Sequence, residues 1–372
     1  MMDKHKIRAL IFLAAAAAVA GYSSLEFYRQ QEKEPLYPSE YLTSKRMLSY
    51  YHPGIPDAAD TEVYIFDSGV PGATLFLAGG THPNEPAGYI AAAVILENLK
   101  AEAGRVILIP RSNISAFSHN DPMEGFPGKY TLQTNSGERE FRIGSRLSNP
   151  LHQWPDPLVY IQYPSGQKLS GFEARNLNRT FPGREGGTFT EEIAFGILQL
   201  IKKEQVSVAI DLHEAAPEIP IINAIVYHEK CEEMTLNAVL ALEFEGLSYS
   251  PERSPENFRG LTHREWGDYS DANPFLMETC NPIQGRLRGK TDADLVVKGV
   301  SEFYKSAKES GKLRIEYDIN GEPLWRRVAR HTEGFKAIIN AYNEAHPGSM
   351  ILVSGIPSYA ELEAQGAGAF LR

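Results

Sequence analysis

Short apolar runs alternate with longer amphipathic stretches from residue 61 onward, which predicts strands and helices in turn. Strands are expected at 63–66, 74–78, 106–109, 206–213 and 350–354, and helices at 86–100, 191–204, 292–310 and 333–344. Strands that alternate with helices favour parallel pairing, because each helix carries the chain back across the sheet. The expected fold is α/β, with a mixed, largely parallel sheet flanked by helices.

The amino terminus has a different pattern. Three basic residues among the first eight precede an apolar run over residues 9–20, which is typical of an export signal. Small residues at 18–20 offer a cleavage site, and the run is short for a membrane span. We expect residues 1–22 to be a signal peptide that delivers the chain to the periplasm or the cell exterior. If the signal is an uncleaved signal anchor, residues 7–22 tether the chain to the membrane.

The remaining chain divides by composition. Residues 23–60, rich in Tyr, Glu, Lys and Pro, are expected to form an exposed tether or a first supporting segment. A catalytic domain is expected over 61–310. Within it, residues 112–175 are rich in Gly, Pro, Asn and Ser and too long for a plain connection, which indicates an insertion beside the active site. Residues 311–372 form a C-terminal extension with no assigned function.

Charge and cysteine content narrow the class of protein. The net charge of −10, without a basic patch interleaved with aromatic residues, argues against nucleic-acid binding as the main role. Cys231 and Cys280 could form one disulfide in an exported chain, or remain buried thiols.

Candidate metal ligands follow two of the expected strands. His82 and Glu85 come just after an apolar run that breaks at 79–80, and His213 stands at the carboxyl end of a β-branched run. Zn²⁺ accepts imidazole nitrogen and carboxylate oxygen, and a catalytic zinc site uses three protein ligands. Carboxyl ends of strands share one edge of an open α/β sheet. Asp211, on the same strand face as His213, could orient a ligand or be an ordinary buried, paired carboxylate.

Two further segments carry candidate chemistry. Asn178 and Arg179 stand side by side before a Pro-Gly turn, and a planar guanidinium binds carboxylate groups bidentately. Glu278 ends a short apolar strand, where a general base could take a proton from an activated water.

In their order along the chain, these segments resemble the succinylglutamate desuccinylase/aspartoacylase family of the zinc carboxypeptidase-like group. The motifs are His-x-x-Glu, Asn-Leu-Asn-Arg-x-Phe-Pro-Gly, Asp-Leu-His and Met-Glu-x-x-x-Pro-x-Gln-Gly, spread over roughly residues 61–305. The resemblance implies one Zn²⁺ per chain, with His82, Glu85 and His213 as its ligands. It also implies Glu278 as the catalytic base, with Asn178 and Arg179 binding substrate.

The resemblance also implies two additional arginines. One polarises the scissile carbonyl, and the candidates are Arg175, Arg111, Arg142 and Arg146. The other binds the acid side chain of the substrate, and the candidates are Arg264 and Arg259.

The function expected from these residues is zinc-dependent hydrolysis of the amide bond of an N-acyl amino acid, or of a related small molecule or peptide with a carboxylate. An exported metallocarboxypeptidase acting on peptides or cell-wall peptides is an alternative with the same chemistry and a different pocket. A non-catalytic, envelope-tethered binding protein is an alternative from another class.

Overall fold

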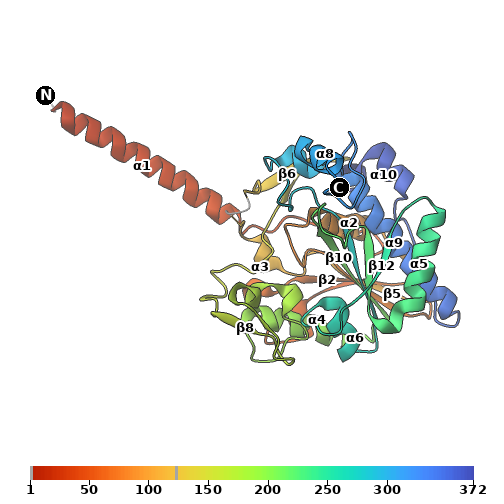
Figure 1. Ribbon diagram of the computed structural model, residues 1–372. Helices are drawn as coiled ribbons and strands as arrows, with labels where there is room; N and C mark the ends of the chain where they lie inside the picture. Colours follow the sequence, from red (N-terminus) through yellow and green to blue (C-terminus); the bar gives the residue numbers. More distant parts are fainter. Residues whose placement is uncertain (1–2, 122–124) are drawn as a thin grey trace.

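The computed structural model describes residues 3–121 and 125–372 (Figure 1). Over these residues the main sheet has eight strands in the order β1-β2-β5-β3-β10-β13-β11-β12. Their bounds are β1 Ser44–Met47, β2 Glu62–Asp67, β5 Arg105–Ile109, β3 Thr74–Ala78, β10 Val208–Ala215, β13 Asn273–Cys280, β11 Ala224–Tyr227 and β12 Ser250–Arg253. The strands β5, β3, β10 and β13 are parallel, whereas β2 and β11 run antiparallel to them. The expected mixed, largely parallel sheet is confirmed.

Both faces of the central strands are buried, which explains their almost continuous apolar sequence. In β3, Leu75 and Leu77 enter one core, whereas Phe76 and Ala78 enter the other. This alternation follows from the two-residue period of a strand. In β10 the same period places Asp211 and His213 on one face.

Helices cover both faces of the sheet (Figure 1). One face carries α2 (Pro86–Asn98), α5 (Glu232–Phe244) and α9 (Leu324–Ala345), with α10 (Tyr359–Gln365) packed against α9. The other face carries α4 (Phe189–Lys203) and α6 (Thr262–Tyr269). Helix α2 is buried from Pro86 to Glu97, so it lies inside the molecule between the sheet and α9.

Two expected helices differ in extent. The segment 292–310 forms two helices, α7 (Ala293–Lys298) and α8 (Glu302–Glu309), because Gly299 adopts a positive φ of 64° and ends α7. The helix expected at 333–344 begins earlier, at Leu324, directly after Pro323.

The amino-terminal helix α1 (Lys4–Arg29) is longer than the apolar run within it, and none of its residues is buried. It projects from the body of the molecule (Figure 1). Among the described residues it is the one helix long and apolar enough to cross a membrane. After it the chain joins the body, where β1 pairs with β2 and Leu48 is buried. Residues 44–60 therefore pack against the body of the molecule.

The insertion at 112–175 begins with the short helix α3 (Ile114–Phe117) and forms two hairpins outside the main sheet. One pairs β6 (Lys129–Thr134) with β7 (Gly137–Arg142), and the other pairs β8 (Val159–Ile161) with β9 (Lys168–Ser170). In the C-terminal extension, β14 (Leu352–Ser354) pairs with β4 (Lys100–Ala103).

The two cysteines are free thiols, and both are buried. They belong to separate apolar clusters, so no disulfide joins them. Burial raises the pKa of Cys231 to about 12 and that of Cys280 well above its ordinary value. The interpretation of both residues as buried thiols is confirmed.

Candidate functional site

A tight turn after β3 delivers His82 and Glu85 to the carboxyl edge of the sheet. Gly80 has a φ of 61°, and a Cβ there would lie 2.8 Å from the Phe117 ring, so the position requires glycine. Glu85 is the N-cap residue of α2, and Pro86 follows as the first helical residue. Proline is favoured there because a backbone N–H at this position would have no partner within the helix. The turn and the helix start together fix the spacing of the two side chains.

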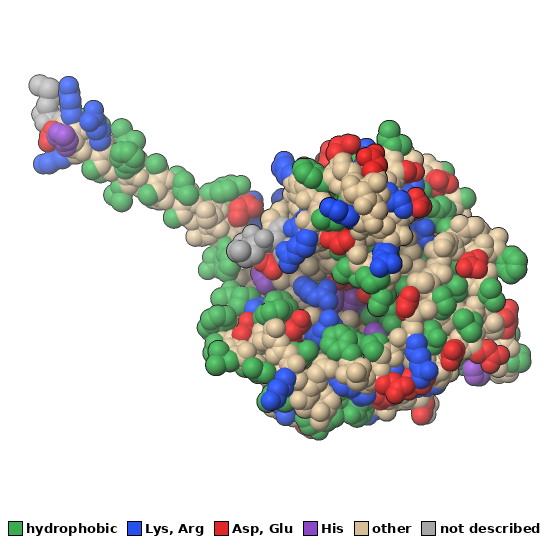
Figure 2. Space-filling view, in the orientation of Figure 1, with side chains coloured by type: hydrophobic (Ala, Val, Ile, Leu, Met, Phe, Trp, Pro, Cys, Tyr) green, Lys and Arg blue, Asp and Glu red, His purple; other side chains and the backbone are tan. Residues whose placement is uncertain are grey.

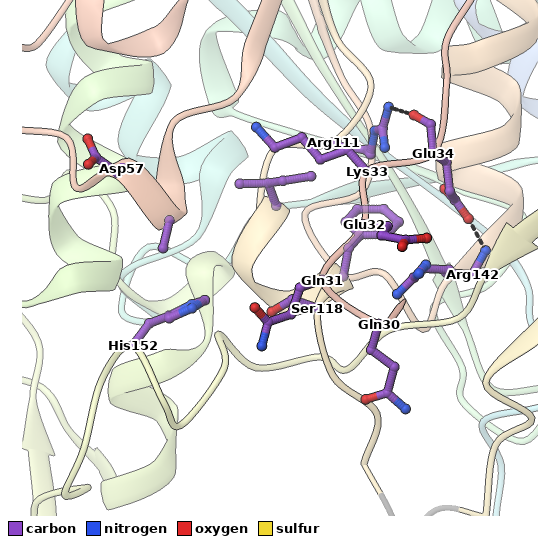
Figure 3. Close-up of a pocket in the computed structure, with 13 residues that line it drawn as sticks. Gln30, Gln31, Glu32, Lys33, Glu34, Asp57, Arg111, Ser118, Arg142 and His152 are labelled. Atoms are coloured by element: carbon purple, nitrogen blue, oxygen red, sulfur yellow. Dashed lines mark hydrogen bonds between the residues drawn. The ribbon is translucent and has the colours of Figure 1, made fainter. Parts of the chain in front are cut away.

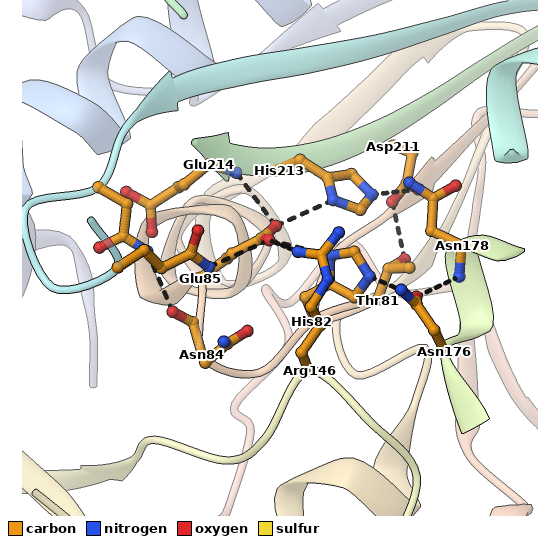
Figure 4. A network of polar contacts seen from close by, with 12 residues as sticks. Thr81, His82, Asn84, Glu85, Arg146, Asn176, Asn178, Asp211, His213 and Glu214 are labelled. Carbon is orange, nitrogen blue, oxygen red and sulfur yellow. Dashed lines mark hydrogen bonds and ion pairs between the residues drawn. The ribbon is translucent and has the colours of Figure 1, made fainter. Parts of the chain in front are cut away.

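His82, Glu85 and His213 meet at this edge, and we call them the inner cluster (Figure 4). The Nδ1 atom of His82 lies 2.9 Å from Glu85 Oε1, and the Nδ1 atom of His213 lies 2.9 Å from Glu85 Oε2. All three side chains are 2% exposed or less. Their ligand atoms lie within 4.8 Å of one another. The sequence prediction that these residues come together is confirmed.

The outer nitrogens of both imidazoles have oxygen partners. His82 Nε2 donates to Asn176 Oδ1 at 2.8 Å, and His213 Nε2 donates to Asp211 Oδ2 at 2.6 Å. Thr81 holds Asp211 in turn through a 2.8 Å hydrogen bond. These acceptors place a proton on each Nε2 and turn each Nδ1 toward the carboxylate between the rings. Asp211 is therefore a buried, paired carboxylate in contact with His213.

Burial and the neighbouring charges shift the pKa values of all three residues of the inner cluster. Burial lowers the pKa of His82 to about 4, and the Arg146 charge adds to this effect. Burial also opposes a charge on His213, but Asp211 and Glu85 raise its pKa well above the ordinary value. Despite its burial, Glu85 has a pKa well below the ordinary value because the two imidazoles lie beside it.

The donor set of the inner cluster fits a divalent metal ion. Two imidazole nitrogens face one carboxylate, and each facing pair needs a proton or a cation between its atoms. These are ligand types that zinc accepts, with their outer partners already in place. A bound cation would compete with the proton on His213, as metals do with ligand protons.

Glu278 lies beside the inner cluster on the neighbouring strand. It is the register partner of His213 in the parallel pair β10–β13. Its Oε2 atom is buried without a hydrogen-bond partner, and burial raises the pKa of the carboxyl group to about 8. In the turn that follows, Gln284 Nε2 donates to Glu85 Oε1 at 3.2 Å. A carboxyl group with such a pKa can accept and return a proton near neutral pH.

Asn178 and Arg179 lie on a 3-10 turn, Leu177–Arg179, at the same edge. Asn178 Oδ1 accepts from the Thr262 amide at 2.9 Å, which ties the turn to the start of α6. The Arg179 guanidinium lies 4.8 Å from the Phe258 ring centroid. Burial lowers the pKa of Arg179 to about 10, while the charges of Glu278 and Glu85 oppose this shift. The pair is therefore electrostatically linked to the inner cluster.

Four arginines were candidates for polarising the scissile carbonyl, and Arg146, in the insertion, is the one that reaches the inner cluster. Its Nη1 atom lies 2.9 Å from Glu85 Oε1, and its side chain is 37% exposed. Arg175 is held elsewhere, because its guanidinium bonds both oxygens of Asp156, at 2.7 and 2.9 Å, and the Ser148 carbonyl. This pairing explains why Arg175 does not point toward Glu85.

Arg111 and Arg142 lie at another pocket, near the end of α1 (Figure 3). Its volume is about 150 Å³. The Arg111 guanidinium donates to the Glu34 carbonyl, and the Arg142 amide donates to the Glu34 carboxylate. Neither arginine has a hydrogen bond to the inner cluster among the described residues.

Arg264 and Arg259 lie beside a second group of metal-ligand residue types, His228, Glu229 and Asp268, which we call the outer cluster. Arg264 Nη1 lies 2.8 Å from Glu229 Oε2, and Arg259 Nη2 lies 2.8 Å from Asp268 Oδ2. His228 Nε2 lies 2.9 Å from Asp268 Oδ1. Both arginines are therefore already paired with carboxylates.

The face of the molecule seen in Figure 2 is hollowed near its centre, where histidine and basic side chains are visible. Arg146 forms an ion pair with Glu85 at this edge, so the site carries charges of both signs.

No family model and no curated protein sequence matches the chain. Structure comparison finds an aspartoacylase family protein from Mesorhizobium loti, with 18% identity and a TM-score of 0.38, over 59% of this chain and 56% of that one. A succinylglutamate desuccinylase from Silicibacter sp. TM1040 shares 18% identity, with a TM-score of 0.39, over 66% and 63%. A metallo-carboxypeptidase from Burkholderia cenocepacia shares 10%, with a TM-score of 0.47, over 86% and 68%.

The first two of these structures bear the name of the family that the sequence motifs resemble. The match spans less than two thirds of the length of each.

Proposed function

We propose that the chain is a zinc-dependent hydrolase that cleaves the amide bond of an N-acyl amino acid or a related carboxylate-bearing substrate. The supporting observation is the convergence of the inner cluster with a proton acceptor. The ligand atoms of His82, Glu85 and His213 lie within 4.8 Å of one another. Glu278 is in register with His213 on the neighbouring strand.

His82 Nδ1, His213 Nδ1 and Glu85 would hold the metal. When bound, Zn²⁺ would supply a positive charge that lowers the pKa of water and of a nearby carboxyl group. Asn176 and Asp211 keep the two imidazoles in the orientation this requires, because each accepts the Nε2 proton. Burial of all three ligands excludes competing water from the protein side of the site.

Glu278 would act as general base and then as general acid. Its Oε2 atom has no hydrogen-bond partner within the described chain, so it is available to a water molecule. The carboxylate would take a proton from the attacking water and deliver it to the leaving nitrogen. The raised pKa of about 8 suits a group that must hold the proton between these two steps.

Asn178 and Arg179 would bind the substrate carboxylate. Arg179 supplies a planar guanidinium that is half-buried, and a charge-assisted hydrogen bond from it to a carboxylate is strong. The Thr262 amide occupies Asn178 Oδ1 and so directs the amide nitrogen of Asn178 away from α6. Arg146 would stabilise the charge that develops on the acyl oxygen, because its guanidinium already reaches the edge of the inner cluster.

We propose further that α1 directs export to the periplasm or the cell exterior. Basic residues precede its apolar part, and the helix is exposed along its length. Mass spectrometry of the amino terminus after cell fractionation tests this. A start near residue 21 in a soluble exported fraction indicates cleavage, whereas intact α1 in the membrane fraction indicates an anchor. An intact chain confined to the cytoplasm would contradict export.

The activity is tested with the full zinc-loaded chain, kept in mild detergent, and a panel of N-acyl amino acids and short peptides. Products are followed by mass spectrometry, and Glu278→Gln is the control because it keeps the shape of the side chain. We expect release of a free amino acid from acyl substrates, with a rate that falls by about 10²–10⁴-fold in the control.

Other outcomes point to other functions. Loss of the carboxyl-terminal residue from peptides, without turnover of acyl amino acids, would support a carboxypeptidase. Equal rates for the intact chain and Glu278→Gln across the panel, with zinc bound to both, would overturn the hydrolase proposal and support a binding protein.

A further inference from the structure

A pocket of about 540 Å³ lies between the edge of the main sheet and the C-terminal extension. We call it the C-terminal pocket. Residues that line it include Asn223, Tyr249, Arg314, Glu322, Arg326 and Arg330. Its volume is within the range of small-molecule sites, roughly 300–1,000 Å³. It shares no residue with the inner cluster or with the substrate-binding pair.

Four buried polar atoms in the lining have no hydrogen-bond partner: Asn223 Oδ1, Tyr249 OH, Glu322 Oε2 and Arg330 Nε. Buried polar groups are almost always paired, so four in one pocket need an explanation. A larger pocket of about 820 Å³, beside Asp268 and Tyr342, has no such atom among its described lining residues. The C-terminal pocket is therefore distinguished by unmet hydrogen bonding rather than by size.

The four atoms divide into two donors and two acceptors. Tyr249 OH and Arg330 Nε can donate, whereas Asn223 Oδ1 and Glu322 Oε2 can accept. A carboxylate accepts from the first pair, and an ammonium group donates to the second. The four atoms therefore match a ligand that carries a carboxylate and an ammonium group.

The lining carries charges of both signs: Glu316 and Asp318 also line the pocket, and Arg326 Nη1 lies 3.8 Å from Glu322 Oε1. Arg326 and Arg330 are held in place, because Arg326 Nη1 donates to the Gly321 carbonyl at 2.9 Å and Arg330 Nη1 donates to the Ser248 carbonyl at 3.0 Å. Planar guanidinium groups fixed in this way are suited to a carboxylate. Burial raises the pKa of the Glu322 carboxyl, and a bound cationic group would lower it again.

We propose that the C-terminal pocket binds a free amino acid, with its carboxylate at Tyr249, Arg326 and Arg330 and its ammonium group at Asn223 and Glu322. This assignment gives a binding role to the C-terminal extension. It is independent of the hydrolase proposal, because the pocket and the inner cluster are separate.

The test is calorimetric titration of the full chain in mild detergent. The probes are free amino acids with small, acidic, basic and aromatic side chains, and the half-ligands acetate and ethylamine. All titrations use the Arg179→Met background, so that an amino acid bound at the proposed active site does not contribute. We expect saturable binding of at least one amino acid, and binding of either half-ligand weaker by at least ten-fold.

Variants locate the bound amino acid. Arg326→Met should weaken binding by about ten-fold or more, as expected for the loss of a charge-assisted contact. Arg314→Met is the second variant, because this exposed residue at the rim can be changed without disturbing the core, and a weaker loss is expected. Arg253→Met on β12, outside the pocket and 51% exposed, is the matched control and should bind like the background.

Three results would overturn the proposal. The first is absence of saturable binding for every amino acid. The second is binding unchanged by both Arg326→Met and Arg314→Met, which would place the ligand elsewhere. The third is acetate binding as tightly as the amino acids, which would reduce the pocket to a simple anion site.

Discussion

The inner and outer clusters contain the same kinds of residue and differ in what surrounds them. In the inner cluster the ligands are 2% exposed or less, and the imidazoles are oriented by uncharged Asn176 and anionic Asp211. In the outer cluster Glu229 is 37% exposed, and the buried Arg264 guanidinium lies 2.8 Å from it.

Under the proposed function, this difference favours the inner cluster over the outer one as the place where a cation binds. Arg264 is 2% exposed and cannot leave, so its charge already compensates the outer carboxylates. Arg146 also reaches Glu85, but it is 37% exposed and can move away. Ligand residue types that lie close together are therefore not enough to predict a metal site. A buried arginine beside them can already compensate their negative charge.

The largest expected effect comes from the ion pair beneath the inner cluster. Arg327 Nη1 lies 2.7 Å from Glu214 Oε1, and both side chains are fully buried. Arg327→Met should reduce the free energy of unfolding by about 3–5 kcal/mol, because it leaves a buried carboxylate without its partner. Glu229→Gln, which removes a partly exposed carboxylate of the outer cluster, should cost about 1 kcal/mol or less, because Asp268 remains 3.7 Å from Arg264 Nη1.

Urea unfolding measures both losses. Burial raises the pKa of Glu214 to about 7, so the unpaired carboxyl in Arg327→Met can take a proton at low pH. The loss should therefore be smaller at pH 5 than at pH 8. Equal losses for the two variants would contradict the contrast between a buried and an exposed ion pair.

Removal of one histidine from each cluster compares their metal binding directly. His213→Ala should lower zinc affinity by at least about 100-fold, more than the loss of an orienting residue would. His228→Ala should leave the zinc content unchanged, because the outer carboxylates are paired with arginines. Elemental analysis after dialysis, with competition titration, gives both values. A drop in zinc content for His228→Ala would show that the outer cluster holds a metal.

The orienting carboxylates should show a smaller contrast. Asp211→Asn keeps the size of the side chain but weakens its hold on His213 Nε2, so zinc affinity should fall by about 10–100-fold. Asp268→Asn changes the corresponding partner of His228 and should have no effect on zinc. Competition with a chelator resolves affinity changes of this size. Full affinity in Asp211→Asn would mean that the imidazole is fixed by packing alone.

The sequence predicted the inner cluster because its members follow apolar strands whose ends share one edge. His82, Glu85 and His213 were predicted from the strand pattern together with the order of the motifs, and Asp211 was placed on the same face as His213 by the two-residue period. The approach of Arg146 to Glu85 depends on the path of the insertion, which no local pattern encodes.

Two other residues of the site were not predicted, for the same reason: their contacts depend on how the chain folds. Asn176 and Gln284 stand inside motifs that were recognised, but their partners are distant in sequence, so only the folded chain shows which imidazole or carboxylate they meet. The division of the helix at 292–310 had a visible signal in Gly299, whereas the early start of α9 after Pro323 is set by packing against α2 and α5.

The last prediction concerns the pH dependence of stability at His263, on which charges from both clusters act. Its two ring nitrogens are buried without hydrogen-bond partners, and burial lowers its pKa to about 3, with His213 and Arg264 adding to this shift. The unfolded chain takes up a proton at this residue near pH 6.5, whereas the folded chain does so only near pH 3. Stability is therefore complete above about pH 6.5 and is lost as the pH falls toward 3, by about 1.4 kcal/mol per pH unit.

His263→Phe removes this titration while retaining an apolar ring of similar size. Unfolding free energies measured from pH 7 to pH 4 should fall less steeply for the variant than for the unchanged chain. Protonation of the inner-cluster histidines and acid release of any metal affect both chains alike, so the difference between the slopes isolates His263. Parallel slopes would contradict this account, because they would mean that His263 is already protonated in the folded chain or that water reaches its ring.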